Sequence, residues 1–387
     1  MAYKSLRLAL ALLGVANALP TPAVSDVIPG QYIVTLRPEV GHELELHTRW
    51  VSDVHREGLR KRGGDTVGVE NKFDIPGFHA YAGSFDDETL AVIRANSSVL
   101  RVEEDKIIRL SDTQTSPPWG LSAISNPKGY AANAPYNYDS TAGSGIFAYV
   151  IDSGILLTHN EFQGRAVAGY STGRSTDRHH GTLVAAIVGG VTYGVAKKVT
   201  LVDVQVMDGE TGSTSSVLAG IQWAVNDVKA KGRANKSVAN MSLGGSNSAT
   251  MNNAVQAMVD AGITVAVAAG NEGRDASSSS PANQPNVITV GAADSSYRRA
   301  SFSNYGVDVD IFSPGVQILT ADSTSNSATY TSSGTSEAAP HVAGVAAYLL
   351  GKEGAQTPAQ VRARIVDLAL KNVVTDPKGS ADLFLHI

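Results

Sequence analysis

Residues 146–154 read Ile-Phe-Ala-Tyr-Val-Ile-Asp-Ser-Gly, an apolar run that ends in an aspartate and turns at a glycine. Further apolar runs occur at Ile263–Ala268 and Val287–Val290. They alternate with segments of helical, amphipathic pattern at Ser215–Lys231 and Thr250–Ala261. Continuous apolar strands that alternate with helices are typical of a parallel sheet covered on both faces. The sequence therefore predicts an α/β fold for this part of the chain.

The part of the chain before this region has a different pattern. Gln31–Leu36 is strand-like, residues 40–62 are charge-rich with helical spacing, and Val99–Leu110 resembles a strand with charged residues. Asp86 directly precedes a second helical stretch, as a helix-capping residue does. Strands and helices in this order predict a small α+β domain. The polar, proline-containing stretch Ser111–Pro118 predicts an exposed linker to the larger domain.

The first residues have the three parts of a secretory signal. Lys4 and Arg7 give a positive start, Leu8–Val15 is apolar, and Ala16–Ala18 is a small-x-small cleavage site. The alternative is a buried N-terminal helix. The apolar run is too short to span a bilayer, and no later stretch reaches 18 apolar residues. We therefore expect a secreted, extracellular protein with no membrane anchor.

Composition excludes several classes of site. The 387 residues contain no cysteine, which excludes disulfides, thiolate metal sites and a cysteine nucleophile. The formal net charge of −5 gives no reason to expect a nucleic-acid partner. Because disulfides are absent, stability must come from the size of the core, with or without bound ions. Hydrophobic residues make up 43% of the chain, so a sizeable core can be buried.

Four residues have the chemistry of nucleophilic catalysis. Asp152 ends an apolar strand, where it can orient a histidine, although aspartate there is also a common turn residue. His180 opens an apolar helix-like run and is a candidate general base, or else a capping or core histidine. Ser336 follows Gly-Thr at a helix start, where free N–H groups can stabilise an oxyanion, although serine is also a common N-cap. Asn271 ends another buried strand and can donate to the same oxyanion.

In the order Asp, His, Asn, Ser, which is the order known from subtilisin, these residues resemble the subtilisin-like serine protease family and its proteinase K-like group. The resemblance covers nearly the whole chain. It rests on the motifs Pro118–Leu121, Asp152–Gly154, Glu161–Arg165, His180–Thr182, Tyr193–Lys197, Asn240–Gly245, Ala268–Asn271, Val287–Ala292, Phe302–Gly306 and Gly334–Ser336.

The resemblance also implies a domain organisation. Residues from about 30 to 110 resemble the inhibitor-type propeptide of this family. We therefore expect a signal peptide at 1–18, an inhibitor-type propeptide at 19–112 and a subtilisin-like peptidase domain at 113–387. The implied fold of the last domain is a parallel central sheet with helices on both faces. The implied partners are protein or peptide substrates and the chain's own propeptide, which would act as an intramolecular inhibitor. The enzyme is expected to be a monomer.

The resemblance further implies the activity of a serine endopeptidase. Ser336 would attack the peptide carbonyl, His180 would take its proton, and Asp152 would hold the imidazole. Asn271 and the backbone N–H of Ser336 would bind the oxyanion. The substrate-binding residues would be an edge that pairs with an extended peptide and the walls of a side-chain pocket: Ser242, Leu243, Gly244, Ala268, Ala269 and Gly270. Small, uncharged walls predict broad specificity with a preference for bulky apolar residues before the cut.

No cofactor is required for this chemistry, but the resemblance implies a structural calcium site. Its ligands would be the carbonyls of Pro285 and Val287 with the carboxylate of Asp310, because oxygen ligands suit a hard cation. Formal glycan acceptor sites begin at Asn96, Asn235 and Asn240. Among the two in the larger domain, Asn240 precedes the substrate edge and should be protected, so Asn235 is the better candidate.

Three residues depart from the family pattern. Glu337 follows the nucleophile where the family usually has Met, His179 precedes the catalytic histidine in place of Gly, and Leu183 replaces a second histidine. All three lie beside the active centre and leave the triad intact. Two functions therefore stay open: an active secreted endopeptidase, or a degenerate subtilase that binds peptides or performs a restricted acyl transfer.

Overall fold

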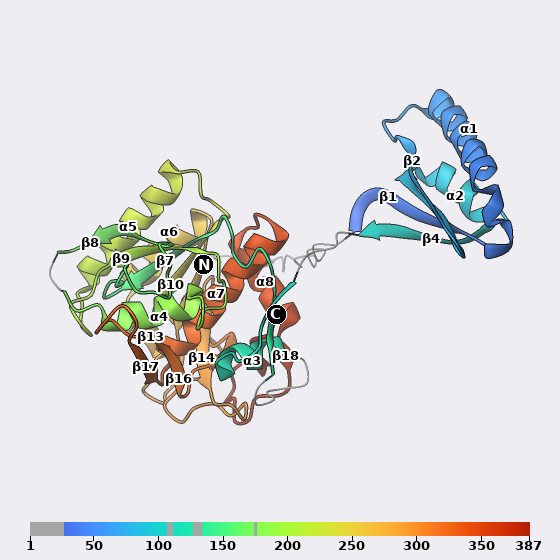
Figure 1. Ribbon diagram of the computed structural model, residues 1–387. Helices are drawn as coiled ribbons and strands as arrows, with labels where there is room; N and C mark the ends of the chain where they lie inside the picture. Colours follow the sequence, from blue (N-terminus) through green and yellow to red (C-terminus); the bar gives the residue numbers. More distant parts are fainter. Residues whose placement is uncertain (1–26, 107–110, 127–133, 174–175) are drawn as a thin grey trace, which may run out of the picture. The chain divides into compact units, whose positions relative to one another are not determined.

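The computed structural model describes residues 27–106, 111–126, 134–173 and 176–387. The chain divides into two compact units, residues 1–109 and 110–387 (Figure 1). The signal peptide expected at 1–18 lies outside the described residues. Within the described ranges, no helix has the length and apolar character that crossing a bilayer requires.

The first unit is a four-stranded antiparallel sheet with two helices packed on one face (Figure 1). Its sheet order is β2-β3-β1-β4. Its elements are β1 (Val27–Leu36), a 3₁₀ turn (Pro38–Glu43), α1 (Leu44–Arg62), β2 (Gly68–Ile75), β3 (Phe78–Ser84), α2 (Asp87–Ala95) and β4 (Val99–Lys106). The two helices bury apolar residues such as Val51 and Ile93 against Val34 and Tyr81 of the sheet.

The α+β prediction for this unit agrees with the structure, with differences at two places. The expected helix starts at Leu44, because residues 38–43 form a 3₁₀ turn. Two strands rather than one lie between the helices, since Gly77, at φ 82°, forms the tight turn of a hairpin. The last strand is described to Lys106, and the rest of its expected length falls in 107–110, outside the described residues. As predicted, Asp86 caps α2 by accepting a 2.7 Å hydrogen bond from the Thr89 N–H.

The second unit contains a nine-stranded sheet of order β18-β19-β15-β14-β12-β10-β7-β9-β8 among the residues described. Its strands are β7 (Phe147–Asp152), β8 (Ala166–Ser171), β9 (Thr200–Gln205), β10 (Ser237–Met241), β12 (Ile263–Ala268), β14 (Ile288–Ala293), β15 (Ile311–Pro314), β18 (Leu370–Lys371) and β19 (Leu383–Phe384). All neighbours pair in parallel except β18 and β19 at the edge. The predicted parallel sheet is confirmed.

Helices cover both faces of this sheet, as predicted. They are α3 (Trp119–Ser125), α4 (His179–Gly189), α5 (Thr214–Ala230), α6 (Ala249–Asp260), α7 (Thr335–Glu353) and α8 (Pro358–Leu368). Helices α4 and α7 contribute to one apolar cluster, and α5 and α6 contribute to another across the sheet. Two-sided covering explains why the strands are apolar throughout rather than alternating.

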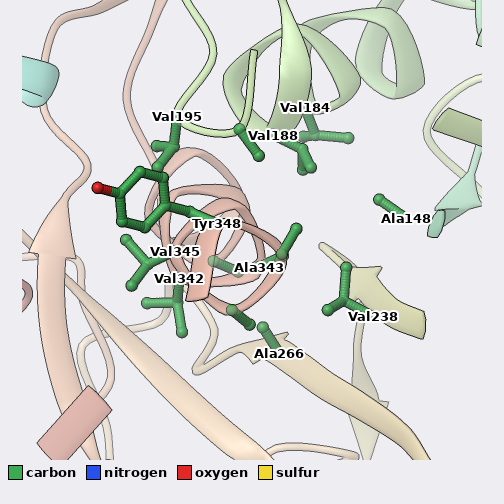
Figure 2. Close-up of a cluster of buried hydrophobic side chains, with 14 of the residues drawn as sticks. Ala148, Val184, Val188, Val195, Val238, Ala266, Val342, Ala343, Val345 and Tyr348 are labelled. Carbon is green, nitrogen blue, oxygen red and sulfur yellow. The ribbon is translucent and has the colours of Figure 1, made fainter. Parts of the chain in front are cut away.

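Helix α7 lies at the centre of the larger core (Figure 2). Its Val342, Val345 and Tyr348 are buried, and α4 contributes Val184 and Val188 to the same cluster. Burying a side chain of this size stabilises the fold by about 1.5–3 kcal/mol. The buried part of each helix therefore fixes the position of its first turn, where the predicted catalytic residues His180 and Ser336 lie.

The linker predicted at Ser111–Pro118 is wrong for its first half. Residues Ser111–Gln114 form strand β5, which pairs antiparallel with β6 (Tyr136–Asp139). The Thr113 hydroxyl donates to Asn137 Oδ1 at 2.8 Å. Polar residues can form such a strand because its partner supplies the backbone hydrogen bonds, which sequence polarity alone does not reveal.

Candidate active site

The predicted catalytic residues gather at the carboxyl ends of three adjacent parallel strands. Asp152 ends β7, Ser242 directly follows β10, and Asn271 follows β12. In the sheet β10 pairs with β7 on one side and with β12 on the other. The carboxyl edge of an open parallel sheet is where such folds place their ligands. The parallel order of these strands therefore brings residues that are distant in sequence to one edge.

Asp152 and His180 form a hydrogen-bonded pair at this edge. His180 Nδ1 lies 2.7 Å from Asp152 Oδ1, and the side chains are 28% and 2% exposed, respectively. The backbone N–H of Ser153 also donates to Asp152 Oδ1 at 2.7 Å. Gly181 permits this approach, because a Cβ there would lie 2.2 Å from the carbonyl oxygen of Gly154. The buried carboxylate thus orients the partly exposed imidazole.

The charges around His180 favour its protonated form. Burial lowers the pKa of His180, but the carboxylates of Asp152, Glu337 and Glu210 outweigh burial and raise that pKa to about 9. A general base must be unprotonated to accept a proton. Chemistry that depends on neutral His180 is therefore favoured by alkaline pH.

Ser336 lies in the first turn of α7, beside the His180 pair. Its hydroxyl donates to the Ser242 carbonyl at 3.5 Å, and no Ser336–His180 hydrogen bond is present among the described residues. Both residues nevertheless line one cleft of about 390 Å³ together with Asp152. Catalytic hydrogen bonds are often long or misaligned in unliganded enzymes and tighten when substrate binds. The structure thus brings Asp152, His180 and Ser336 to one cleft, without a hydrogen bond between His180 and Ser336.

Asn271 is held with its amide nitrogen available as a donor. Its Oδ1 accepts hydrogen bonds from the Thr335 N–H at 2.8 Å and from the Thr335 hydroxyl at 2.9 Å. The Thr335 oxygen in turn accepts from the Gly270 N–H at 3.1 Å. Two donors on Oδ1 fix which end of the amide is oxygen. The opposite end, Nδ2, is left on the side of the cleft, which Asn271 lines with Ser336.

The residues predicted to bind substrate line one pocket of about 360 Å³ next to Ser336 and Asn271. They are Ser242, Leu243, Gly244, Ala268, Ala269 and Gly270. The pocket also contains Glu272 and Arg274, whose charged groups lie 3.8 Å apart. The expectation of an uncharged pocket is therefore wrong, because Glu272 and Arg274, which follow Asn271 in the chain, also line it. Both charges are about half exposed, so solvent screens them.

Comparison with known proteins identifies the family. Residues 143–383 match the Subtilase family. The chain belongs to the subtilase family. Residues 31–111 match the Peptidase inhibitor I9 family, so this subtilase also carries an inhibitor domain. Members of this family are serine peptidases that need no cofactor for catalysis, and the chain is a serine endopeptidase.

Relatives support the same assignment along nearly the full length. Alkaline protease 1 of Aspergillus clavatus is 50% identical, over 97% of this chain and 97% of the relative. Alkaline protease 1 of Aspergillus oryzae is 46% identical, over 97% and 95%. The crystal structure of a cold adapted subtilisin-like serine proteinase is 40% identical, with a TM-score of 0.66, and the match covers 70% of this chain and 98% of that one.

Glu337 directly follows Ser336, the predicted nucleophile, where the resemblance implied Met. Its side chain is 2% exposed, lines the cleft with His180, and approaches Gly334 so closely that a Cβ there would lie 2.7 Å from Oε2. Burial raises the pKa of Glu337, opposed by the charge of His180 and a hydrogen bond from Ser332. A carboxylate this close to an oxyanion site disfavours the negative charge that develops there, unless it is protonated.

Replacing Glu337 with methionine is expected to raise kcat by roughly 3- to 30-fold, where each ~1.4 kcal/mol is tenfold. The acid limb of the pH profile should also move to lower pH, because Glu337 raises the pKa of His180. The measurement is the rate on one apolar chromogenic peptide from about pH 5 to pH 10. Glu337→Gln is the control, because it removes the charge but keeps a polar side chain. Equal rates for all three forms at every pH would show that Glu337 does not affect the chemistry.

The other two departures, His179 and Leu183, both lie on α4. Leu183 is buried, and its carbonyl accepts a 2.9 Å hydrogen bond from Thr320. His179 pairs with Asp322, whose carboxylate lies 2.6 Å from Nδ1. Sequence reasoning placed His179 beside the active centre but did not find its partner. Asp322 follows a short strand more than a hundred residues later, and no local motif marks it.

The calcium ligands implied by the resemblance fit the ion poorly here. Asp310 Oδ2 accepts from the Thr289 N–H at 2.8 Å, and Oδ1 is hydrogen-bonded to the Arg362 guanidinium. The guanidinium supplies the positive charge that a cation would bring. In the part of the chain that the structure describes, no group of three or more His, Asp or Glu side chains is arranged to hold a metal.

Proposed function

We propose that this chain is the precursor of a secreted endopeptidase in which Ser336 is the nucleophile, His180 the general base and Asp152 the residue that orients His180. The observation that carries the proposal is the 2.7 Å Asp152–His180 hydrogen bond in the cleft that Ser336 lines at the start of α7. This combination supplies a nucleophile, a base and an orienting carboxylate within one site.

The reaction proceeds in two halves. Ser336 Oγ attacks the peptide carbonyl carbon while its proton moves to His180 Nε2, and the Nδ1–H remains bonded to Asp152. His180 then gives that proton to the departing amine, which leaves an ester between Ser336 and the acyl half of the substrate. Water, deprotonated by the same imidazole, hydrolyses the ester and restores the serine. The names of two relatives, both called alkaline protease, fit a base whose pKa is raised.

The oxyanion of each tetrahedral intermediate is bound by Asn271 Nδ2 and by the backbone N–H of Ser336. The two hydrogen bonds that Thr335 donates to Asn271 Oδ1 support this role, because they orient the Nδ2 donor before substrate binds. The start of α7 adds the positive end of the helix dipole and free N–H groups. Preorganised donors of this kind need no rearrangement during the reaction.

Substrate binds as an extended peptide along Ser242, Leu243 and Gly244, and the side chain before the cut enters the pocket beside Ala268 and Gly270. The small walls favour bulky apolar side chains with broad specificity. The lining of this pocket by the edge residues supports the placement. Any preference for charge at the pocket mouth would come from Glu272 and Arg274, which largely neutralise each other.

Maturation separates the signal peptide at 1–18 and the inhibitor domain from the peptidase domain. The predicted mature N-terminus lies between residues 111 and 116. We place it at the Ser111 end of that range, because residues 111–114 pair with β6 within the second unit. The inhibitor domain acts as an intramolecular inhibitor until it is cut away, and the mature enzyme is a secreted monomer.

A serine-reactive phosphonate probe combined with a casein assay separates the two functions left open by the sequence. An active endopeptidase is labelled stoichiometrically and digests casein at many positions. A degenerate subtilase that binds peptides takes up no label and leaves casein intact. Labelling with cleavage of only a few bonds would indicate a restricted acyl-transfer enzyme instead.

Glycosylation of the peptidase domain is expected on Asn235 and not on Asn240. Asn240 is fully buried, and its amide donates to Ser242 Oγ at 3.0 Å, so a glycan there would break the substrate edge. Asn235 lies half-buried in the turn before β10. Removing N-glycans enzymatically should lower the mass of the mature protein, and Asn235→Gln should abolish that shift. A glycan on Asn240 in active enzyme would contradict the placement of the substrate edge.

We propose that Arg362, rather than a calcium ion at Pro285, Val287 and Asp310, neutralises Asp310. Chelator is then expected to leave Tm unchanged, whereas Arg362→Met should lower it by roughly 2–6 °C, since 1 kcal/mol shifts Tm by about 2–4 °C in domains of this size. Arg362→Lys is the control that keeps a positive charge. A fall in Tm on adding chelator would restore calcium as the stabilising group.

A further inference from the structure

A second histidine–carboxylate pair lies directly beside the Asp152–His180 pair. His179 Nδ1 lies 2.6 Å from Asp322 Oδ1, and the Asp322 Oδ2 atom accepts from the Thr324 hydroxyl at 2.7 Å. The His179 ring also meets Tyr330 edge-on, with ring centroids 5.0 Å apart. The proposed chemistry uses none of these residues. Two contacts on one partly exposed histidine, with a further hydrogen bond on its carboxylate partner, indicate a built arrangement rather than a chance surface contact.

This second pair joins the two parts of the structure that carry His180 and Ser336. His179 is the first residue of α4, and His180 is the second. Asp322 and Tyr330 belong to the hairpin of β16 (Ile318–Ala321) and β17 (Thr329–Ser332), which leads through Gly334 into α7. The pair therefore spans from the helix of the base to the hairpin that delivers the nucleophile.

The start of α4 depends on such contacts. Arg178, at the N-cap position, makes no side-chain capping hydrogen bond. The His179 N–H donates instead to Asp177 Oδ1 at 3.0 Å, and the His179 side chain reaches across to the hairpin. One turn further on, the Thr320 hydroxyl donates to the Leu183 carbonyl at 2.9 Å. Two contacts along one helix fix both its position and its rotation relative to the hairpin.

Asp322 is suited to a permanent contact of this kind. Burial alone would raise the pKa of Asp322, but hydrogen bonds from Thr324 and His179 hold it below its usual value. The carboxylate is therefore ionised throughout the working pH range and always accepts from His179. Neutral His179 with its proton on Nδ1 and protonated His179 can both make this hydrogen bond.

We propose that His179 and Asp322 form a positioning pair that sets the separation between His180 and Ser336. The inference rests on the proposed function, because it deepens the role of that same site. The pair touches neither substrate nor the reacting atoms, and it acts through the placement of the first turn of α4. In the unliganded enzyme Ser336 Oγ donates to the Ser242 carbonyl and not to His180, so the two side chains must come together when substrate binds. How closely His180 approaches Ser336 then depends on how firmly α4 is held. Misplacement by about 1 Å can cost such a reaction up to 10²-fold.

The test compares variants of the pair with a variant of Thr158, whose side chain contacts the loop between β16 and β17. In His179→Ala and Asp322→Ala, kcat on an apolar chromogenic peptide should fall by roughly 10-fold or more, while KM stays within twofold. The rate of labelling by a phosphonate probe should fall in parallel. The double variant should lose no more than either single one, because the two residues act as a unit. His179→Asn should restore most of the rate, since its side-chain N–H can donate to Asp322.

Thr158→Val is the matched control, because the Thr158 hydroxyl donates to Asn326 Oδ1 at 2.8 Å, a bond to the hairpin that involves neither His179 nor Asp322. It should lower Tm without changing kcat. Unchanged kcat in both alanine variants would overturn the inference, and so would a loss of kcat in Thr158→Val that matches theirs. The 10-fold loss with His179→Asn rescue supports it. If the unaltered enzyme itself lacks activity and labelling, the proposed function fails instead.

Discussion

Ser336→Ala is expected to abolish proteolysis and to leave the precursor uncut. Removing the nucleophile of a catalytic triad of this kind costs roughly 10⁶ in kcat, because His180 then has no hydroxyl to activate. The residual rate should not depend on pH through His180. Casein hydrolysis by purified variant measures the first effect, and the intact mass of the secreted chain measures the second.

The effect on maturation follows from where the junction lies. The inhibitor domain ends near residue 111, and the peptidase fold begins with β5. If the chain cuts its own junction, the Ser336→Ala precursor should keep both units joined when expressed alone. Adding a trace of active enzyme distinguishes a folded, cleavable junction from a misfolded chain. Normal processing of the variant in a host that lacks related proteases would show that the chain does not cut its own junction.

Asn271→Ala is expected to lower kcat by about 10²–10³-fold with little change in KM. The donor that it removes is used mainly when negative charge develops on the substrate oxygen, so ground-state binding is largely unaffected. The loss should be present at every pH, because an amide does not titrate. Thr335→Val is a graded comparison: it removes the hydroxyl bond to Asn271 Oδ1 but keeps the backbone one, so its loss should be smaller.

A loss in Asn271→Ala of less than about threefold would show that the backbone N–H groups at the start of α7 bind the oxyanion alone. A rise in KM at constant kcat would place Asn271 in substrate binding instead. Circular dichroism should be close to that of the unaltered enzyme, with a modest fall in Tm because the buried Thr335 N–H and hydroxyl lose their acceptor.

Sequence alone predicted the elements that are driven by local pattern. Apolar runs such as Ile263–Ala268 became strands at the expected residues, because burial on both faces requires continuous apolar sequence. Capping chemistry located the start of α2 at Asp86. Strand β5 was missed because its stability comes from pairing with β6, a long-range contact that polar residues do not reveal.

The candidate site shows the same division. Asp152, His180, Asn271 and Ser336 could be named from the motifs around them, and the parallel strand order brings them to one edge. The partners contributed by distant loops could not be named. Arg362 beside Asp310 and Asp322 beside His179 depend on tertiary packing, whereas the charged pair Glu272 and Arg274 is local and directly follows Asn271 in the sequence. The Arg362 partner is also the reason why the implied calcium ligands fit the ion poorly.

The central claim is that Ser336 is the nucleophile and that His180 activates it. The most direct measurement is peptide mapping of the mature enzyme after reaction with a peptidyl phosphonate at about pH 8. The account predicts one adduct per chain, on Ser336, formed at least 10³-fold more slowly in His180→Ala. An adduct on another residue, or none in an enzyme that still digests casein, would contradict it.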